Sequence, residues 1–453
     1  MADPLAAAKR CELHVHTGGC FYAEDLLELG REVYRHVDWT LFTEGYQEAY
    51  GVRPDPVALF EEALTGDAAA VGRFRDHFVY RGEDGGDFGC FQAKFNLIVP
   101  LVRYWWLVLG REAELTQLLV RRHRREGLQY VEYRSMAPAS VEDPETFIHF
   151  HRTNAEVMAA ESGDGFEARY IISLPRQHPV EGYELVQRLF DLHPGLIPTV
   201  VGLDFCFYEE GFPPKTVAPL FERLRRDNAA RPGRALEVVY HVGESFFDKS
   251  LESAVRWCHE IAELGARRLG HCIALGLDPA VAVARRPGAH TREPTAERLD
   301  QIAYDLQHAE ALAAYGIKID RQGLEQEKEA LRKTGETVVQ RPYDEPRLAA
   351  IRRRQDFALD RLAALGAAVE TCPASNLRIG GVPHPEHHPA HRFIDSPVDL
   401  VISADDPGIF DAPLATEVDW LRDHGRLDAE GLAARLGDPR RLALGRLRPT
   451  ATA

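Results

Sequence analysis

Short apolar runs alternate with longer amphipathic stretches along the chain. Several of the runs are apolar at consecutive positions, which is typical of parallel strands that are buried on both faces. The stretches between them, such as TVAPLFERLRR and SLESAVRWCHEIAELG, carry apolar residues at helical spacing. Eight runs are rich in β-branched or aromatic residues: 11–16, 130–134, 169–174, 200–205, 237–242, 267–271, 368–372 and 398–403. Because eight parallel strands can close a ring, the pattern predicts an α/β fold, namely a (β/α)8 TIM-type barrel with additional helices.

Two intervals between these runs are much longer than one helix requires. More than a hundred residues separate the first two runs, and nearly as many separate the sixth from the seventh. The second interval opens with the loop-like sequence ARRPGAHTREPT and then returns to helical spacing. We therefore predict a long insertion between strands 6 and 7, a helical segment at about 276–356 that is a candidate lid or oligomer contact. Residues 1–453 are expected to form a single barrel domain.

Composition and charge exclude several classes of binding partner. The 453 residues are 45% hydrophobic and carry 54 Lys and Arg against 70 Asp and Glu, a net charge of −16. This balance argues against a general nucleic-acid or anionic-membrane binder, because the phosphate charge would be repelled. No run reaches the ~18 apolar residues of a membrane span, and the first residues do not resemble a secretion signal. We expect a cytoplasmic protein that acts on a small molecule, with no nucleic-acid or membrane partner.

The first candidate ligands are two histidines in the first predicted strand. His14 and His16 alternate by two, so both imidazoles point to the same side of the strand, into the barrel. In that position they can share one metal ion. By itself, the pair also fits two ordinary core or surface histidines.

Two further histidines end the fifth and sixth predicted strands. His241 is followed by Gly243 and Glu244, and the glycine permits a bend that turns the carboxylate toward the barrel mouth. A glutamate that favours a helix N-terminus is the alternative interpretation. His271 ends the run RRLGH, where a structural histidine would also fit.

Two adjacent acids, Asp405 and Asp406, follow the last predicted strand. Their charges repel each other unless a cation or a helix start compensates them, and helix capping explains one acid better than two. Barrel enzymes gather their catalytic groups at the carboxyl ends of different strands, and these acids and the histidines all fall there. Histidines with one carboxylate form a set suited to Zn²⁺ with a position left for water.

The order of the motifs resembles that of the adenosine deaminase family within the metal-dependent amidohydrolase superfamily. The matching segments are ELHVH at 12–16, FQAKF at 91–95, YVEYRSMAP at 130–138, VVGLD at 200–204, HVGE at 241–244, RLGH at 268–271, CPASN at 372–376 and ADDP at 404–407. The resemblance implies one catalytic Zn²⁺ per chain, bound by His14, His16, His241 and Asp405.

The resemblance also implies roles for the remaining residues. Glu244 would face N1 of a purine, and His271 and Asp406 would flank the attacking water. A base near a metal-bound water and an acid near the ring nitrogen are the groups that addition to C6 requires. Gly243, Asp406 and Phe207 are the candidate substrate-binding residues.

Two positions depart from the family pattern near the expected substrate. Family members follow H-x-H with Leu-Asp-Gly, whose Asp contacts the ribose, whereas this chain has Thr17-Gly18-Gly19. Phe207 stands where the family has a Gly that lets the backbone approach the purine. The zinc machinery is complete, so the departures concern which aminopurine is the substrate.

The sequence thus predicts a zinc-dependent hydrolytic deaminase of a 6-aminopurine nucleoside, adenosine or a modified adenosine-like compound, that releases ammonia. One alternative is another amidohydrolase-type reaction on a nucleoside-like or cyclic amide substrate; many such barrels use two metals and a carboxylated Lys, and no strand-end Lys is evident here. The other is a non-catalytic nucleoside-binding protein, against which the complete set of acid, base and ligand residues argues.

Overall fold

The computed structural model describes residues 3–84, 88–137, 141–286 and 290–448. Its main sheet has eight strands in the order β1-β2-β3-β4-β5-β6-β9-β10, and all neighbouring pairs are parallel. The strands are β1 Cys11–His16, β2 Tyr130–Met136, β3 Glu167–Ser173, β4 Val200–Asp204, β5 Glu237–Val242, β6 Arg268–His271, β9 Ala368–Thr371 and β10 Asp399–Ile402. These are the eight predicted runs, with ends that differ by no more than two residues. The predicted (β/α)8 barrel is confirmed.

The ring closes just beyond the end of β10. Asp405 and Val15 form an isolated parallel bridge. The backbone N–H of His16 donates to the carbonyl of Asp405, and the N–H of Asp405 donates to the carbonyl of His14, both at 2.9 Å. The first and last strands are therefore joined at their carboxyl ends by the same residues that carry the candidate ligands.

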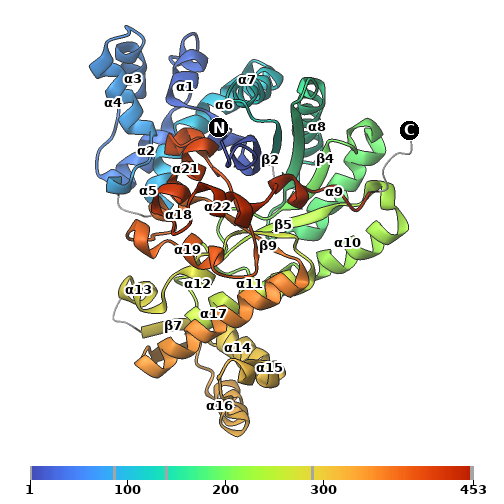
Figure 1. Cartoon of the computed structure of the whole chain (residues 1–453). Coiled ribbons are helices and arrows are strands. Elements are labelled where there is room, and N and C mark those ends of the chain that lie inside the picture. The colour runs from blue at the N-terminus through green and yellow to red at the C-terminus, as the bar shows by residue number, and fades with distance from the viewer. Residues whose placement is uncertain (1–2, 85–87, 138–140, 287–289, 449–453) are drawn as a thin grey trace.

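Helices surround the barrel and connect its strands (Figure 1). The connecting helices are α8 Pro144–Glu161, α9 Pro179–Leu192, α10 Ala218–Ala230, α11 Leu251–Leu264, α17 Glu345–Leu365, α18 Pro373–Arg378 and α19 Ala390–Ile394, and α20 Pro407–Phe410, α21 Leu414–His424 and α22 Ala429–Leu436 follow β10. Their ends follow ordinary capping rules. The Oγ of Ser250 accepts the N–H of Ser253 at the start of α11, and Gly265 ends that helix in the left-handed conformation.

The long connection between β1 and β2 is helical. It contains α1 Ala23–Gly30, α2 Thr40–Tyr50, α3 Pro56–Ala63, α4 Ala68–Phe78, α5 Phe88–Phe95, α6 Ile98–Arg103, a π-helical turn at Tyr104–Val108 and α7 Glu112–Arg125. Apolar residues of α1 and α3–α7 join the main hydrophobic core. The connection is therefore packed against the barrel and supplies one wall of the pocket described below.

The segment between β6 and β9 lies outside the ring, as predicted. It contains α12 Ile273–Gly276, α13 Pro279–Ala284, α14 Thr295–Gln307, α15 Ala309–Ala314 and α16 Arg321–Thr334, and it extends away from the barrel in Figure 1. The prediction of a helical insertion is wrong in one respect, because β7 His290–Pro294 and β8 Val338–Pro342 pair as a two-stranded antiparallel sheet, with α14–α16 between them in the sequence. The buried residues of β7 are Thr291 and Glu293, so it has no apolar run to reveal it. Helix α17 continues through the predicted end of the insertion and leads directly into β9.

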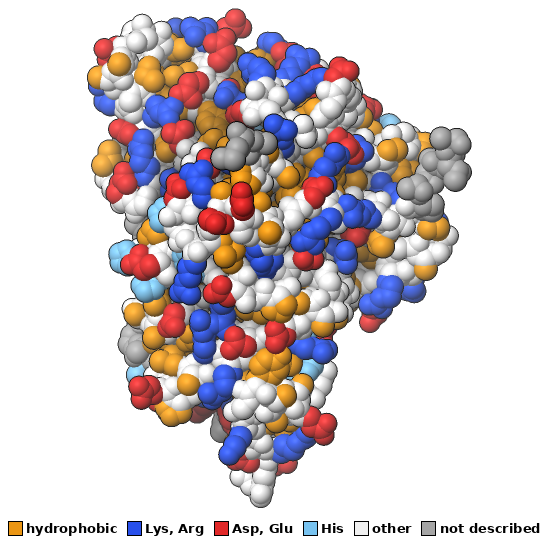
Figure 2. Space-filling view, in the orientation of Figure 1, with side chains coloured by type: hydrophobic (Ala, Val, Ile, Leu, Met, Phe, Trp, Pro, Cys, Tyr) orange, Lys and Arg blue, Asp and Glu red, His pale blue; other side chains and the backbone are white. Residues whose placement is uncertain are grey.

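No helix among the described residues is both long enough and apolar enough to cross a membrane. On the face shown in Figure 2, basic and acidic side chains are interspersed over the surface.

Candidate active site

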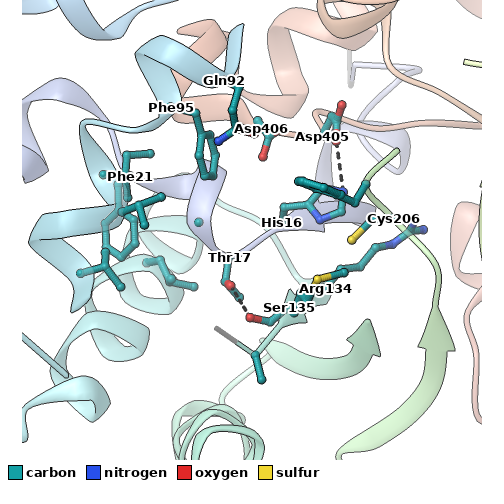
Figure 3. Close-up of a pocket in the computed structure, with 18 of the residues that line it drawn as sticks. His16, Thr17, Phe21, Gln92, Phe95, Arg134, Ser135, Cys206, Asp405 and Asp406 are labelled. Atoms are coloured by element: carbon teal, nitrogen blue, oxygen red, sulfur yellow. Dashed lines mark hydrogen bonds and ion pairs between the residues drawn. The ribbon is translucent and has the colours of Figure 1, made fainter. Parts of the chain in front are cut away.

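A pocket opens at the carboxyl ends of the barrel strands (Figure 3). Its cavity measures about 470 Å³, within the range that holds a small-molecule ligand. The predicted site residues among its described lining are His16, Phe207, His241, Glu244, His271, Asp405 and Asp406. His14 lies beneath them, fully buried. The structure therefore brings together residues that are nearly 400 positions apart in the sequence.

Three of the imidazoles are held by an oxygen acceptor at Nδ1. The Nδ1 of His14 is 2.9 Å from Glu370 Oε2, that of His241 is 3.0 Å from Asp204 Oδ1, and that of His271 is 2.9 Å from Asn376 Oδ1. A ring that donates its Nδ1–H in this way presents an unprotonated Nε2 on its other side. Burial favours this neutral form of His241, because it lowers the pKa of the ring well below its ordinary value.

The free ring nitrogens converge on Asp405. The Oδ1 of Asp405 lies 3.4 Å from Nε2 of His14 and 3.3 Å from Nε2 of His16, and the Nε2 atoms of His16 and His241 are 3.2 Å apart. Two ligands 2.0–2.1 Å from a tetrahedral zinc ion lie about 3.3 Å apart. The Nε2 of His14 is buried and has no hydrogen-bond partner among the described residues. The donor types, their spacing and this unpartnered nitrogen all fit a zinc ion.

Asp405 owes its place to an unusual backbone conformation. Its φ is +62°, and His271 has a φ of +64°, both in the left-handed region that residues other than glycine rarely adopt. The two backbone hydrogen bonds to β1 hold Asp405 in that conformation. Strain of this kind at the ends of strands commonly marks a functional site.

Glu244 is positioned by the turn after β5. Gly243 has a φ of +68°, and its N–H donates to Glu209 Oε2 at 2.7 Å. The turn brings Glu244 Oε1 to 3.6 Å from Nε2 of His271. Burial raises the pKa of Glu244, and the neighbouring Asp405 acts in the same direction. A raised pKa makes the protonated form, which can donate a hydrogen bond, more accessible than it is for a carboxyl group in water.

Asp406 lies between the first and last strands of the ring. Gly19 passes so close that a Cβ at that position would be 1.8 Å from Asp406 Oδ1, so only glycine leaves room for the carboxylate. Burial raises the pKa of Asp406, and the charges of Asp405 and Glu244 add to the effect. The second aspartate is therefore directed into the pocket rather than used as a helix cap, since it makes no capping hydrogen bond to α20.

Two predicted substrate-binding residues are placed differently from the rest. Phe207 lines the pocket but is 58% exposed, and its ring packs against Phe88 and Tyr208 at the mouth. Gly243 is not among the described lining residues; its N–H is occupied by Glu209. Direct contact of either residue with a substrate stays a prediction.

Charged residues fill the barrel interior below the histidines. Arg268 pairs with Glu132 and with Glu370, and Arg134 pairs with Glu370 at 2.6 Å. All four side chains are fully buried. Two arginines thus hold Glu370 ionised, and its pKa lies well below the ordinary value despite its burial. Glu370 in turn can orient His14.

The residues that hold the imidazoles were not among the predicted site residues. Asp204 and Asn376 occur within the motifs VVGLD and CPASN, and Glu370 lies in the buried strand β9. An acid at an inward position of a buried strand is costly unless it is paired, so Asp204 and Glu370 were detectable signals. Their partners, however, come from other strands and could not be read from the sequence.

The chain is thus a parallel barrel with a buried cluster of histidines and an aspartate at its strand ends, a set of side chains that could hold a metal ion. The family model described as adenosine deaminase matches residues 350–437. An adenine deaminase of Rhizobium leguminosarum is 41% identical over 71 residues, which is 16% of this chain and 22% of the relative. The predicted resemblance to the adenosine deaminase family is confirmed over this segment. The matched segments span about a fifth of the length of the curated relatives.

Solved structures share the fold across almost the whole chain. The Arabidopsis ADAL protein, solved in complex with GMP, has a TM-score of 0.57 and 14% sequence identity, and the alignment covers 97% of this chain and 93% of that one. An amidohydrolase from Burkholderia ambifaria with bound Zn has a TM-score of 0.51 and 12% identity, with 97% and 87% covered. At these identities the likeness supports the fold alone.

Proposed function

We propose that the protein hydrolyses the 6-amino group of a purine compound and releases ammonia, with one zinc ion held by His14, His16, His241 and Asp405. The observation that carries this proposal is the convergence of their free ligand atoms at 3.2–3.4 Å beside Glu244, His271 and Asp406. The family relatives named adenine deaminase and the zinc in the Burkholderia structure support it.

His271, Glu244 and Asp406, which surround the candidate zinc ligands, carry out different parts of the reaction. When bound, zinc supplies a Lewis acid that lowers the pKa of a water molecule toward about 7. His271 Nε2 would accept a proton from the attacking water, because its Nδ1–H bonds Asn376. The amide of Asn376 is itself fixed, since its Nδ2 donates to Thr371 Oγ1 at 3.3 Å.

Glu244 and Asp406 act on the purine. Protonated Glu244 donates to ring N1 while the water oxygen adds to C6, so the electron pair displaced onto the ring is neutralised. Asp406 lies beside Asp405 in the lining and orients the water and the leaving amino group. The amino group then takes the proton held by His271, the C6–N bond breaks and ammonia leaves. The hydroxyl at C6 loses its proton, which restores protonated Glu244, and the product carries a carbonyl at C6 and hydrogen on N1.

The direct test is turnover by the zinc-loaded protein. Adenine, adenosine, deoxyadenosine and AMP are each incubated with it, and ammonia release and the ultraviolet shift of the purine are followed. Conversion of at least one 6-aminopurine, lost on chelation and restored by zinc, is expected. Failure to convert any of them would refute the proposal.

A substitution of Glu244 separates the chemistry from metal binding. Glu244→Gln removes the transferable proton but keeps the size of the side chain, so kcat is expected to fall about 10²–10⁴-fold. Zinc content should stay at one per chain, whereas His241→Ala should release the metal. Unchanged turnover in the Gln variant would contradict the assigned role of Glu244.

A further inference from the structure

The pocket extends well beyond the catalytic groups as an apolar arm. We use this term for the part lined by Phe91, Phe95, Ile98, Val102, Trp106 and Leu119. These residues come from α5, α6, the π-helical turn and α7, the helices of the long connection between β1 and β2. In Figure 3, Phe21 and Phe95 lie on one side of the pocket, and His16 and Asp405 lie on the other. A ligand that reaches the catalytic groups therefore has an apolar wall on its far side.

The arm begins at Gly18, directly after the H-x-H pair. A Cβ built on Gly18 would lie 3.0 Å from Cζ of Phe95, so the aromatic ring covers this position. Gly18 is also where the family pattern has the aspartate that contacts ribose. An acceptor for sugar hydroxyls is thus replaced by a phenyl ring from α5.

The polar groups along the arm are bonded mainly to one another. The hydroxyls of Thr17 and Ser135 are 2.8 Å apart, and the hydroxyl of Thr116 is 2.6 Å from Asn154 Oδ1. The amide of Asn154 also donates to a backbone carbonyl. A ribose needs partners for its hydroxyl groups, and a wall whose polar groups already pair gives it few.

The charged side chains around the arm do not favour the binding of a phosphate group. Arg134 is in the lining, but it is fully buried and two carboxylates balance its charge: its Nη2 bonds Glu370, and its Nη1 lies 3.6 Å from Asp204. Beyond the catalytic end, the charged side chains of the described lining are Arg103, which is exposed, and Glu112, which has the opposite sign. A phosphate monoester would meet one solvated arginine and a carboxylate.

From these observations we infer that the preferred substrate is a 6-aminopurine with an apolar substituent at the sugar end of the ring, in place of a sugar phosphate. This inference rests on the proposed deamination and specifies its substrate class. Two kinds of compound have this chemistry: a purine with an alkyl group on N9, and a nucleoside whose 5′ position carries an apolar group. In both, the apolar group lies in the arm while C6 faces the catalytic residues.

The test compares kcat/KM for two homologous series, 9-alkyladenines from methyl to hexyl and 5′-deoxy-5′-alkylthioadenosines, with adenine, adenosine and AMP as references. Each methylene group that enters the arm should raise kcat/KM about fourfold, the factor for ~0.8 kcal/mol per buried CH₂. The series that shows this slope identifies the kind of substituent. AMP should be the poorest substrate.

The outcomes distinguish the inferred substrate preference from the proposed deamination. If adenine or adenosine is converted but neither series gains with chain length, or if AMP is preferred, the inference is overturned and the proposed deamination stands. If no 6-aminopurine is converted, the proposed function fails and the inference fails with it.

A matched pair of variants locates the effect in the arm. Val102→Trp fills the arm, and the advantage of the hexyl over the methyl compound should fall at least tenfold. Val108→Trp is the control, because Val108 is 62% exposed and lies outside the described lining. It should leave the advantage unchanged. Thermal melting of both variants identifies a folding defect, in which case the substrate series of the unaltered protein still decides the question.

Discussion

At the scale of single residues, the site depends on hydrogen bonds to the far side of each imidazole. Asp204, Glu370 and Asn376 each provide an oxygen to one Nδ1 atom, at 2.9–3.0 Å. These bonds select the tautomer whose Nε2 can bind a metal or accept a proton. None of the three acceptors is among the described residues that line the pocket, so they act through the histidines. They are positioning residues.

Asn376 provides the clearest test of such a residue. Asn376→Ala removes the acceptor of His271, so the ring loses its fixed tautomer, and kcat is expected to fall about 10–100-fold. Asn376→Asp keeps an oxygen at that position and should restore much of the rate, with a shifted pH profile because a carboxylate stabilises the protonated ring. Zinc content should be unchanged in both variants. Equal rates and identical pH profiles for the alanine and the parent protein would contradict this role.

At the scale of elements, strands were predicted accurately where burial on both faces left apolar residues at most positions or at alternate positions. β1 and β5 have the predicted bounds, and their residues are almost all buried. The two-stranded sheet of β7 and β8 was missed because it is held by polar contacts. Glu293 on β7 accepts a hydrogen bond from Arg341 on β8 at 3.0 Å, and it also accepts the N–H of Ser250. Such a strand has no hydrophobic periodicity.

Helix α21 contains a carboxyl group whose ionisation should control stability. Glu417 is buried, and burial raises its pKa to about 8 from an ordinary 4.5. A raised pKa means that the folded state holds the proton more tightly than the unfolded chain. The contribution of Glu417 to the free energy of unfolding is therefore largest at low pH. It falls as pH rises from about 4.5 to 8, by up to ~1.4 kcal/mol per pH unit.

Glu417→Gln should remove this contribution. The glutamine can still accept the N–H of Ala374, which Glu417 Oε2 accepts at 2.9 Å, but it cannot ionise. Urea unfolding at pH 5, 6, 7 and 8 should show a smaller loss of stability with pH than in the parent protein, with the largest difference at pH 8. Glu430→Gln, on the exposed face of α22, is the control and should keep the parent slope. Parallel slopes for all three proteins would contradict the prediction.

At the scale of the whole molecule, the insertion is docked on the barrel through buried ion pairs. Arg354 on α17 binds Asp305 on α14 through two bonds of 2.6 and 2.9 Å, and Arg256 on α11 pairs with Glu297 on α14. Removing one partner leaves a buried charge without compensation, which costs about 3–5 kcal/mol. The position of α14 therefore depends on these pairs. A role of the insertion as a lid or an oligomer contact stays a prediction.

Arg354→Met tests this docking. Amide hydrogen exchange is expected to become faster in α14 and in β7, the strand that precedes it, because their local stability falls while the barrel strands keep theirs. Arg352→Met, at an exposed position of the same helix, should not change the exchange of α14. Equal exchange rates of the α14 amides in the two variants would contradict the prediction.

The sequence by itself determined the barrel, the order of its strands and the identity of the candidate ligands. Continuous apolar runs are a local consequence of burial, and chemically active side chains at the ends of such runs can be recognised without knowing their neighbours. Only the tertiary structure decided how those side chains meet. The bridge between Val15 and Asp405, the acceptors behind the imidazoles and the apolar arm all join segments distant in sequence. Contacts of this kind depend on packing in three dimensions, which leaves no periodic trace along the chain.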